Sequence, residues 1–338
     1  MGKRALVTGV TGQDGMYLSR ELLAAGYEVF GLVRGQQNPK IGKLKRLLPD
    51  LRVAHGDLLD QASLICAVEN FQPDEIYNLG AVSYVPVSWQ QPALTTDVTG
   101  IGPLRILEAI RIVSGIGSGS RAQAAGVKFY QASTSEMFGM VAESPQSERT
   151  PLHPRSPYGV AKAYGHHITQ NYRESYGIFA VSGILFNHES PFRGSEFVTR
   201  KVSIGAARIA LGLEQELPLG NLDARRDWGF AGDYVKAMKM MLDTKEAEDY
   251  VIGTGVTHSV RDLARVAFEC VGLDWEKYVV VDRDLLRPAD VELLCADASK
   301  ARERLGWVPE TSFEEVITSM VEADLARLSG DKKEPLLA

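Results

Sequence analysis

Short apolar runs alternate with amphipathic stretches along the first half of the chain. Residues 3–8 predict a short buried strand, and apolar positions 16, 18, 22 and 23 follow it at helical spacing until Gly26. Similar patterns predict strands at 27–33, 52–55, 74–79, 128–132 and 179–185, with helices at 61–70 and from 92 to about 113. This rhythm predicts an α/β fold with a Rossmann-type doubly wound parallel sheet, in which ligands bind at the carboxyl ends of the strands.

The second half is less regular, because glycine and proline interrupt it more often. Helical spacing recurs at 197–213, 233–242 and 259–271. We therefore predict a Rossmann domain over 1–185, to which 221–255 contributes, and a smaller, partly interleaved substrate domain over 186–330. The glycine-rich segment 114–126 predicts a loop that is either a lid or a neutral insertion, and residues 331–338 predict a frayed tail.

Three glycines lie between the first strand and the first helix. They form the pattern Gly9-Val-Thr-Gly12-Gln-Asp-Gly15. Gly9 and Gly12 would let the backbone turn tightly and approach a pyrophosphate, Gly15 would let the helix pack on the strand, and the helix N-terminus would attract phosphates. The alternative is a glycine-rich turn with no ligand. The strand–turn–helix context favours a dinucleotide site.

The end of the second strand bears on the choice of dinucleotide. An acidic residue there would favour the ribose hydroxyls of NAD, whereas this chain has Arg34, which suits the 2′-phosphate of NADP. The alternative is a solvated arginine. The sequence therefore predicts NADP.

Composition limits the remaining classes of function. The 338 residues allow a large core, and a formal net charge of −6 argues against a general nucleic-acid binder. The three cysteines suggest neither a disulfide framework nor a metal site, and His166 and His167 lack further ligands at metal spacing, so we expect packing roles and no metal. We also expect a cytoplasmic protein without a signal peptide, a membrane span or a membrane partner.

Candidate chemistry follows the fifth strand. Ser133-Thr134-Ser135-Glu136 ends that strand, and Tyr158 and Lys162 lie four positions apart on one predicted helix face. A nearby ammonium would favour the ionised form of the phenol, and Glu136 would add a second acid or base. The alternatives are a surface Tyr/Lys pair and an acid that only satisfies a helix dipole.

Longer stretches support a resemblance to a known family. The chain resembles the extended short-chain dehydrogenase/reductases, and within them the GDP-mannose 4,6-dehydratase family. The matching stretches are Val7–Asp14, Phe129–Glu136, Pro154–Lys162, Asn171–Glu174, Ile184–Pro191, Phe197–Lys201, Gly220–Asp223, Arg226–Gly229 and Arg287–Pro288. Departures from the usual family pattern are Gly35, Val82 and Tyr84, together with the 114–126 insertion.

The resemblance implies a role for each site residue. The catalytic set is Thr134, Glu136, Tyr158 and Lys162. The cofactor would contact Gly9, Thr11, Gly12, Gln13, Asp14, Gly15, Arg34, Asp57, Leu58, Leu79, Ala81, Ser83, Tyr158, Lys162, His188 and Arg193. The nucleotide sugar would contact Ser135, Asn187, Lys201, Arg226, Arg287 and Glu292.

The resemblance also implies the reaction. Tyr158 would take the proton of the sugar 4-hydroxyl as C4 is oxidised, and Glu136 would remove the C5 proton so that the C6 hydroxyl leaves as water. This converts GDP-D-mannose to GDP-4-keto-6-deoxy-D-mannose for deoxysugar biosynthesis, with tightly held NADP regenerated in each cycle, in a homodimer or homotetramer. The alternatives are a dehydratase of a related GDP-sugar such as a heptose, a 4-keto-sugar reductase or epimerase, and a non-catalytic NADP sensor.

Overall fold

A seven-stranded parallel sheet forms the centre of the larger unit. The computed structural model describes residues 2–35, 38–117, 126–285 and 293–330. The strand order is β11-β6-β5-β4-β1-β2-β3, and every neighbouring pair is parallel. In that order the strands are Tyr250–Ile252, Ala180–Leu185, Lys128–Thr134, Glu75–Asn78, Arg4–Thr8, Glu28–Val33 and Arg52–His55. The predicted Rossmann-type α/β fold is confirmed.

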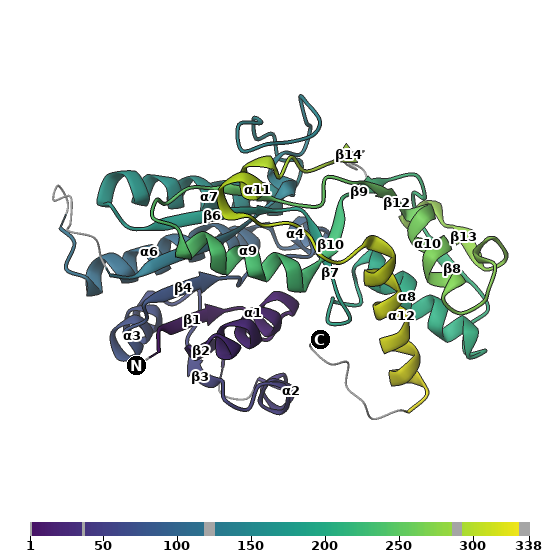
Figure 1. The fold of residues 1–338 in the computed structure, drawn as a ribbon, viewed down its shortest axis with the longest axis horizontal. Helices are drawn as coiled ribbons and strands as arrows, with labels where there is room; N and C mark the ends of the chain where they lie inside the picture. The colour runs from purple at the N-terminus through teal and green to yellow at the C-terminus, as the bar shows by residue number, and fades with distance from the viewer. Residues whose placement is uncertain (1, 36–37, 118–125, 286–292, 331–338) are drawn as a thin grey trace.

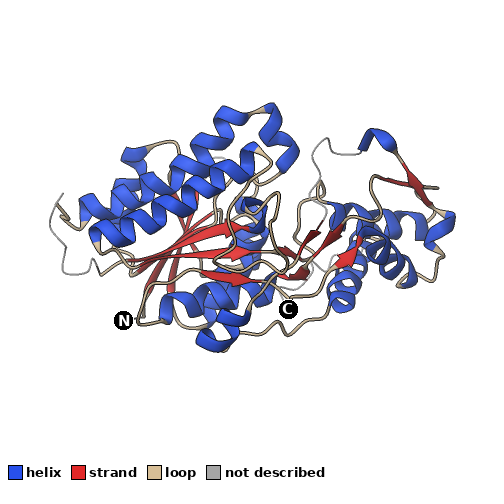
Figure 2. Ribbon diagram, turned by 90° about the horizontal axis from the view of Figure 1, so that it is seen from above, coloured by secondary structure: helices blue, strands red, loops and turns tan. Residues whose placement is uncertain are grey.

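Helices cover both faces of the sheet, as Figure 2 shows. On one face, Leu22 of α1 and Met241 of α9 share a buried cluster with Tyr130 of the sheet. On the other face, Val68 of α3 and Ile110 of α6 belong to a second cluster. The helices of this unit are α1 (Gln13–Ala24), α2 (Ile41–Leu47), α3 (Gln61–Phe71), α4 (Val85–Gln90), α5 (Pro92–Thr95), α6 (Gly102–Val113), α7 (Pro157–Tyr176), α9 (Ala231–Asp243) and α11 (Ser299–Leu305).

Two local features differ from the sequence prediction. Strand β5 continues beyond residue 132 to Thr134, because Ser133 and Thr134 still pair with Ile184 and Leu185 of β6. The single helix expected after residue 92 is α5, a π-helical turn over Thr96–Ile101, and α6. Gly100 in that turn lies so close to α7 that an added Cβ would be 3.2 Å from the carbonyl oxygen of Ala161.

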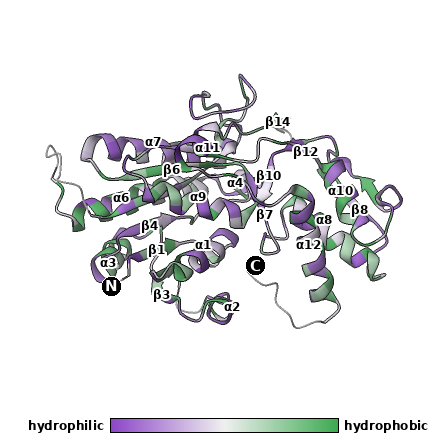
Figure 3. Cartoon of the chain, in the orientation of Figure 1, coloured by the Kyte–Doolittle hydropathy of each residue, from purple (hydrophilic) through white to green (hydrophobic). Residues whose placement is uncertain are grey.

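A second hydrophobic core holds the smaller unit together. It gathers α8 (Val198–Ala210), α10 (Val260–Glu269) and α12 (Phe313–Leu328), which lie away from the large sheet in Figure 1. Figure 3 shows hydrophobic and hydrophilic stretches on α10, as expected of a helix with one buried face. Short strands complete the unit and its junction with the sheet: β7 (Asn187–Glu189), β8 (Leu217–Leu219), β9 (Arg225–Arg226), β10 (Trp228–Phe230), β12 (His258–Ser259), β13 (Val279–Val281) and β14 (Leu293–Leu294).

The chain passes between the two units more than once. After β6 it enters the smaller unit, returns to the sheet with α9 and β11, and leaves again for α10. The boundaries at 185 and 330 stay predictions, but the large sheet does take β11 from within 221–255. Within the described residues, no helix is long and apolar enough to cross a membrane.

Candidate active site

A cavity of about 620 Å³ opens at the carboxyl ends of β1, β4 and β5 and extends to α7, β7 and α8. Most residues that the sequence nominated lie on its wall. They are Gly9, Thr11, Gly12, Gln13, Asp14, Gly15, Leu79, Ala81, Ser83, Thr134, Ser135, Glu136, Tyr158, Lys162, Asn187, His188, Arg193, Lys201 and Arg226.

Five nominated residues are not placed on this wall. Arg34, Asp57 and Leu58 are described but do not line the cavity, and Arg34 is exposed directly after β2. Arg287 and Glu292 lie outside the described residues.

The glycine turn after β1 has the shape that a phosphate cradle requires. Gly9 has a φ of +66°, and an added Cβ there would lie 2.9 Å from the backbone nitrogen of Gly80. At Gly15, a Cβ would lie 2.5 Å from the Gly9 carbonyl oxygen, so a side chain would force α1 off β1. Gly12 caps α1 without a side-chain hydrogen bond, which leaves the first N–H groups of the helix available. These features fit the pyrophosphate of a dinucleotide.

A partly buried ion pair supports this turn from the second half of the chain. Nε2 of His188 lies 2.9 Å from the Asp14 carboxylate, and Nδ1 donates to the Phe186 carbonyl oxygen at 2.7 Å. Because both ring nitrogens face acceptors, the imidazole is held as a cation. Burial opposes charge on both groups, but the Asp14 charge raises the pKa of His188, and the His188 charge lowers the pKa of Asp14 to about 2. Gln13 joins them, since its amide donates to Asp14 and to the His188 carbonyl oxygen, each at 3.0 Å.

Replacing Asp14 with Asn should destabilise the nucleotide-free protein. The pKa of Asp14 lies below its ordinary 3.8, so the pair stabilises the fold above about pH 4, and this stabilisation is lost as the pH falls toward 2. The shift corresponds to about 2 kcal/mol of unfolding free energy at neutral pH. Urea titrations at several pH values should show that loss of unfolding free energy for Asp14→Asn. They should also show that the unfolding free energy of the variant depends less on pH in the acid range.

The matched control for that measurement is Asp223→Asn. Asp223 pairs with Arg261 on the surface, where ion pairs contribute little. If both variants lost the same unfolding free energy, the pair of Asp14 and His188 would stabilise the protein no more than a surface ion pair does.

Tyr158 lies in a buried position near the catalytic strand end. Burial raises the pKa of Tyr158 well above its ordinary value, and a hydrogen bond with the Thr134 hydroxyl only partly offsets that shift. The ammonium of Lys162 donates to the Ala132 carbonyl oxygen at 2.6 Å and lies 5.8 Å from the centre of the Tyr158 ring. Lys162 is not among the main groups that shift the Tyr158 pKa here, so the expectation that its ammonium favours the phenolate stays a prediction. Helical spacing places the two residues on one face, and burial is the largest cause of the pKa shift of each.

Lys162 itself is perturbed by its surroundings. Burial lowers the pKa of its ammonium to about 8, although the charge of Asp14 acts in the opposite direction. The side chain therefore titrates close to neutral pH, where it can gain or lose a proton.

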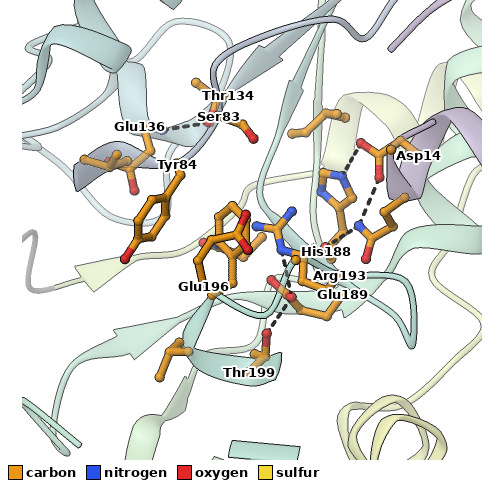
Figure 4. Close-up of a pocket in the computed structure, with 18 of the residues that line it drawn as sticks. Asp14, Ser83, Tyr84, Thr134, Glu136, His188, Glu189, Arg193, Glu196 and Thr199 are labelled. Carbon is orange, nitrogen blue, oxygen red and sulfur yellow. Dashed lines mark hydrogen bonds and ion pairs between the residues drawn. The ribbon is translucent and has the colours of Figure 1, made fainter. Parts of the chain in front are cut away.

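Glu136 lies in a single 3₁₀ turn, Ser135–Met137, directly after β5. Its backbone N–H donates to the Thr134 hydroxyl oxygen at 3.3 Å, and its charge raises the pKa of Tyr158, so the three residues form one group. A three-residue turn has too small a dipole to need a capping acid. Figure 4 shows Thr134 and Glu136 on one wall of the cavity, with Asp14 and His188 at the opposite side.

The wall toward the smaller unit is rich in cations. Asn187 begins β7, Lys201 lies on α8, and Arg226 on β9 donates to the Arg225 carbonyl oxygen at 2.8 Å. All three line the cavity. Lysine and arginine together with an amide suit a diphosphate.

Sequence reasoning missed part of this wall. Glu189, Tyr84 and Phe197 also line the cavity, and the Tyr84 ring packs edge-on against Phe197 at 5.6 Å. Glu189 is an acid that follows Asn187 and His188 just after a predicted strand, and this signal went unused.

His166 and Trp228 have packing roles, whereas His167 lies on the surface. His166 is buried, contacts the Ser133 hydroxyl at 3.3 Å, and has its pKa lowered to about 4 by burial. Trp228 is buried and stacks on Phe313, although it also reaches the cavity. Among the described residues there is no cluster of three or more His, Cys, Asp or Glu that could hold a metal.

Comparison with known proteins supports these observations. Residues 6–320 match the family described as GDP-mannose 4,6 dehydratase. GDP-mannose 4,6 dehydratase 1 of Arabidopsis thaliana is 47% identical, with 98% of this chain and 92% of the relative covered. The human GDP-mannose 4,6 dehydratase is 45% identical, with 95% and 91% covered.

Solved structures share the fold. A dTDP-glucose 4,6-dehydratase from Streptomyces venezuelae with NAD bound superimposes with a TM-score of 0.80 at 26% identity, covering 98% of this chain and 99% of that one. A UDP-glucose 4-epimerase from Thermus thermophilus in complex with NAD gives 0.79 at 28% identity, covering 95% and 98%.

Proposed function

The chain belongs to the GDP-mannose 4,6-dehydratase family, and from this premise we propose how its residues carry out the dehydration of GDP-mannose. The enzyme is a nicotinamide-dependent nucleotide-sugar hydro-lyase. One observation carries the assignment of roles: Thr134, Glu136 and Tyr158 form one group, in a cavity that also contains a glycine cradle and a cationic wall.

The cofactor site fits a dinucleotide. Gly9, Gly12 and the first turn of α1 would hold the pyrophosphate, with Asp14 and His188 beneath it and Arg193 beside it. A nicotinamide held there would supply the hydride acceptor for C4 of the sugar and the hydride donor for C6.

The chain's own residues move the protons. Tyr158 accepts the proton of the 4-hydroxyl, and Thr134 hydrogen-bonds the same oxygen. Once C4 is a ketone, the C5 proton is acidic and Glu136 removes it. The C6 hydroxyl then leaves as water with a proton that Glu136 supplies. Either Tyr158 or a solvent-linked group then returns a proton to C5, and the enzyme is back in its starting state.

The substrate diphosphate would meet Asn187, Lys201 and Arg226. Arg287 and Glu292 are proposed from the resemblance alone. We also propose a cytoplasmic homo-oligomer, and the three free cysteines are compatible with a reducing compartment.

The decisive experiment supplies purified protein with GDP-mannose and a trace of NADP⁺. Mass spectrometry should show a product lighter by one water, formed in amounts far above the cofactor added. A reductase would instead consume NADPH stoichiometrically, an epimerase would leave the mass unchanged, and a sensor would bind NADP without turnover. Retention of the C6 oxygen would reject the proposal.

Replacing Arg34 with Ala tests the preference for NADP. A charge-assisted bond to the 2′-phosphate contributes about 1.5–3 kcal/mol, so the Kd for NADP should rise roughly tenfold to a hundredfold while that for NAD stays constant. Fluorescence titration with NADPH and NADH measures both. Arg52→Ala, at the start of the neighbouring strand, is the control. If Arg34→Ala raised the Kd values for NADPH and NADH by the same factor, Arg34 would not contact the 2′-phosphate.

A further inference from the structure

A buried carboxylate forms part of the cavity wall, and the reaction above does not use it. Glu189 ends β7, is 1% exposed, and pairs in register with Phe230 of β10. A carboxylate in such a place needs compensating partners. Its Oε2 has two: the Thr199 hydroxyl donates to it at 2.6 Å, and Nε of Arg193 forms an ion pair with it at 3.1 Å, without the geometry of a hydrogen bond.

This arrangement fixes one edge of the Arg193 guanidinium. Cζ of Arg193 lies 3.6 Å from the centre of the Phe197 ring, so a cation–π contact restrains the group as well. A guanidinium has five N–H donors, and the ion pair to Glu189 engages only the Nε edge. Arg193 lines the cavity, and Figure 4 shows its guanidinium between Glu189 and the cavity interior.

We propose that Glu189 is a positioning residue that, with Thr199 and Phe197, holds the terminal nitrogens of Arg193 toward a phosphate group of a bound nucleotide. This inference rests on the proposed function and adds a residue to it. Planar, preorganised arginine binds phosphate oxygens bidentately, and fixing the side chain in advance removes the entropy cost of ordering it.

Electrostatics extend the role toward the reacting atoms. The charge of Arg193 lowers the pKa of Tyr158, while Glu136 and Asp14 raise it and Thr134 lowers it through a hydrogen bond. Lys162 lies one turn after Tyr158 on the same helix, and its ammonium donates to the Ala132 carbonyl oxygen. If Arg193 moves away, Tyr158 loses a positive charge that partly offsets the effect of burial on its pKa. Its pKa then rises, and the ascending limb of the pH–rate profile moves to higher pH.

A double-mutant cycle tests the proposal. Glu189→Gln and Arg193→Lys should each raise the Kd for NADPH or for GDP by about tenfold, and the double variant should lose no more than either single one. Titrations with NADPH and with GDP, each alone, tell whether the phosphate belongs to the cofactor or to the sugar nucleotide. Losses that multiply in the double variant would overturn the inference, because Glu189 would then act independently of Arg193.

A second readout separates positioning from mere structural support. Glu189→Gln should shift the ascending limb of kcat to higher pH, whereas a purely structural role would lower Tm and leave both the pH profile and the Kd values unchanged. If Glu189→Gln does not fold, Thr199→Val weakens the same arrangement, and the same two readouts should move in the same direction by a smaller amount.

The matched control is Asp324→Asn. Asp324 is 2% exposed and forms an ion pair with Arg200 between α12 and α8, and neither residue lines the cavity. This variant should lower Tm without changing nucleotide binding or the pH profile. Both binding titrations run without turnover, so a wild-type protein that failed to dehydrate GDP-mannose would reject the proposed function and leave this test intact.

Discussion

Replacing Glu136 with Gln should stop the loss of water while the first half-reaction continues. Glutamine keeps the size and polarity of the side chain but cannot accept the C5 proton, so elimination should slow by roughly a thousandfold. Oxidation at C4 does not need Glu136, because Tyr158 and Thr134 act on the 4-hydroxyl, and it should still reduce the bound nicotinamide. Stopped-flow absorbance should therefore show reduced cofactor accumulating after GDP-mannose is added, while mass spectrometry shows no dehydrated product.

Glu143→Gln is a suitable control for this experiment. Glu143 accepts a hydrogen bond from Thr150 at 2.5 Å and does not line the cavity, so its loss should leave turnover unchanged. Normal dehydration by Glu136→Gln would remove Glu136 from the mechanism, and absence of any cofactor reduction would show that it acts before elimination.

Replacing Tyr158 with Phe should abolish the first step itself. The phenol is the group proposed to accept the 4-hydroxyl proton, and its loss should reduce turnover by roughly a thousandfold or more with no accumulation of reduced cofactor. The hydroxyl makes one hydrogen bond, to Thr134, so the fold should lose only about 1 kcal/mol. Single-turnover absorbance, NADPH titration and thermal melting together distinguish loss of chemistry from loss of structure.

Tyr164→Phe provides the comparison on the same helix. Tyr164 is 40% exposed and does not line the cavity, so the variant should turn over at the wild-type rate. If Tyr158→Phe retained substantial activity, another group would have to be the base, and Lys162, whose pKa is about 8, would be the first to examine.

The fold and the catalytic group could be predicted because their signals are local. Glycine spacing, the apolar run of each strand and the position of Thr134 and Glu136 at a strand end are all readable within a few residues. The seventh strand was not predicted as such, because β11 has only three residues and joins the sheet from a distant part of the chain. Its sequence is too short to show a period.

The protonation of the site could not be predicted, because it depends on burial and on distant partners. Spacing alone placed Lys162 beside Tyr158, yet it could not show that the ammonium is directed to a backbone carbonyl. Likewise, His188 and Asp14 are 174 positions apart, and only the packing of β7 near α1 makes them a pair. Helical spacing predicts which side of a helix a residue faces, whereas its protonation state depends on the groups that tertiary packing brings near it.

Residues 186–249 separate β11 from β6 along the chain, and this distance has a consequence for folding on the ribosome. All six residues of β6 are buried, and β11 covers the edge of β6 that β5 leaves open. A nascent chain that has emerged only as far as β6 therefore presents an apolar strand with unpaired backbone groups, the kind of edge on which chains aggregate. Protection must wait until residues 250–252 have left the exit tunnel, so a fragment truncated after residue 185 should be insoluble even though it contains the glycine cradle and the catalytic Tyr158.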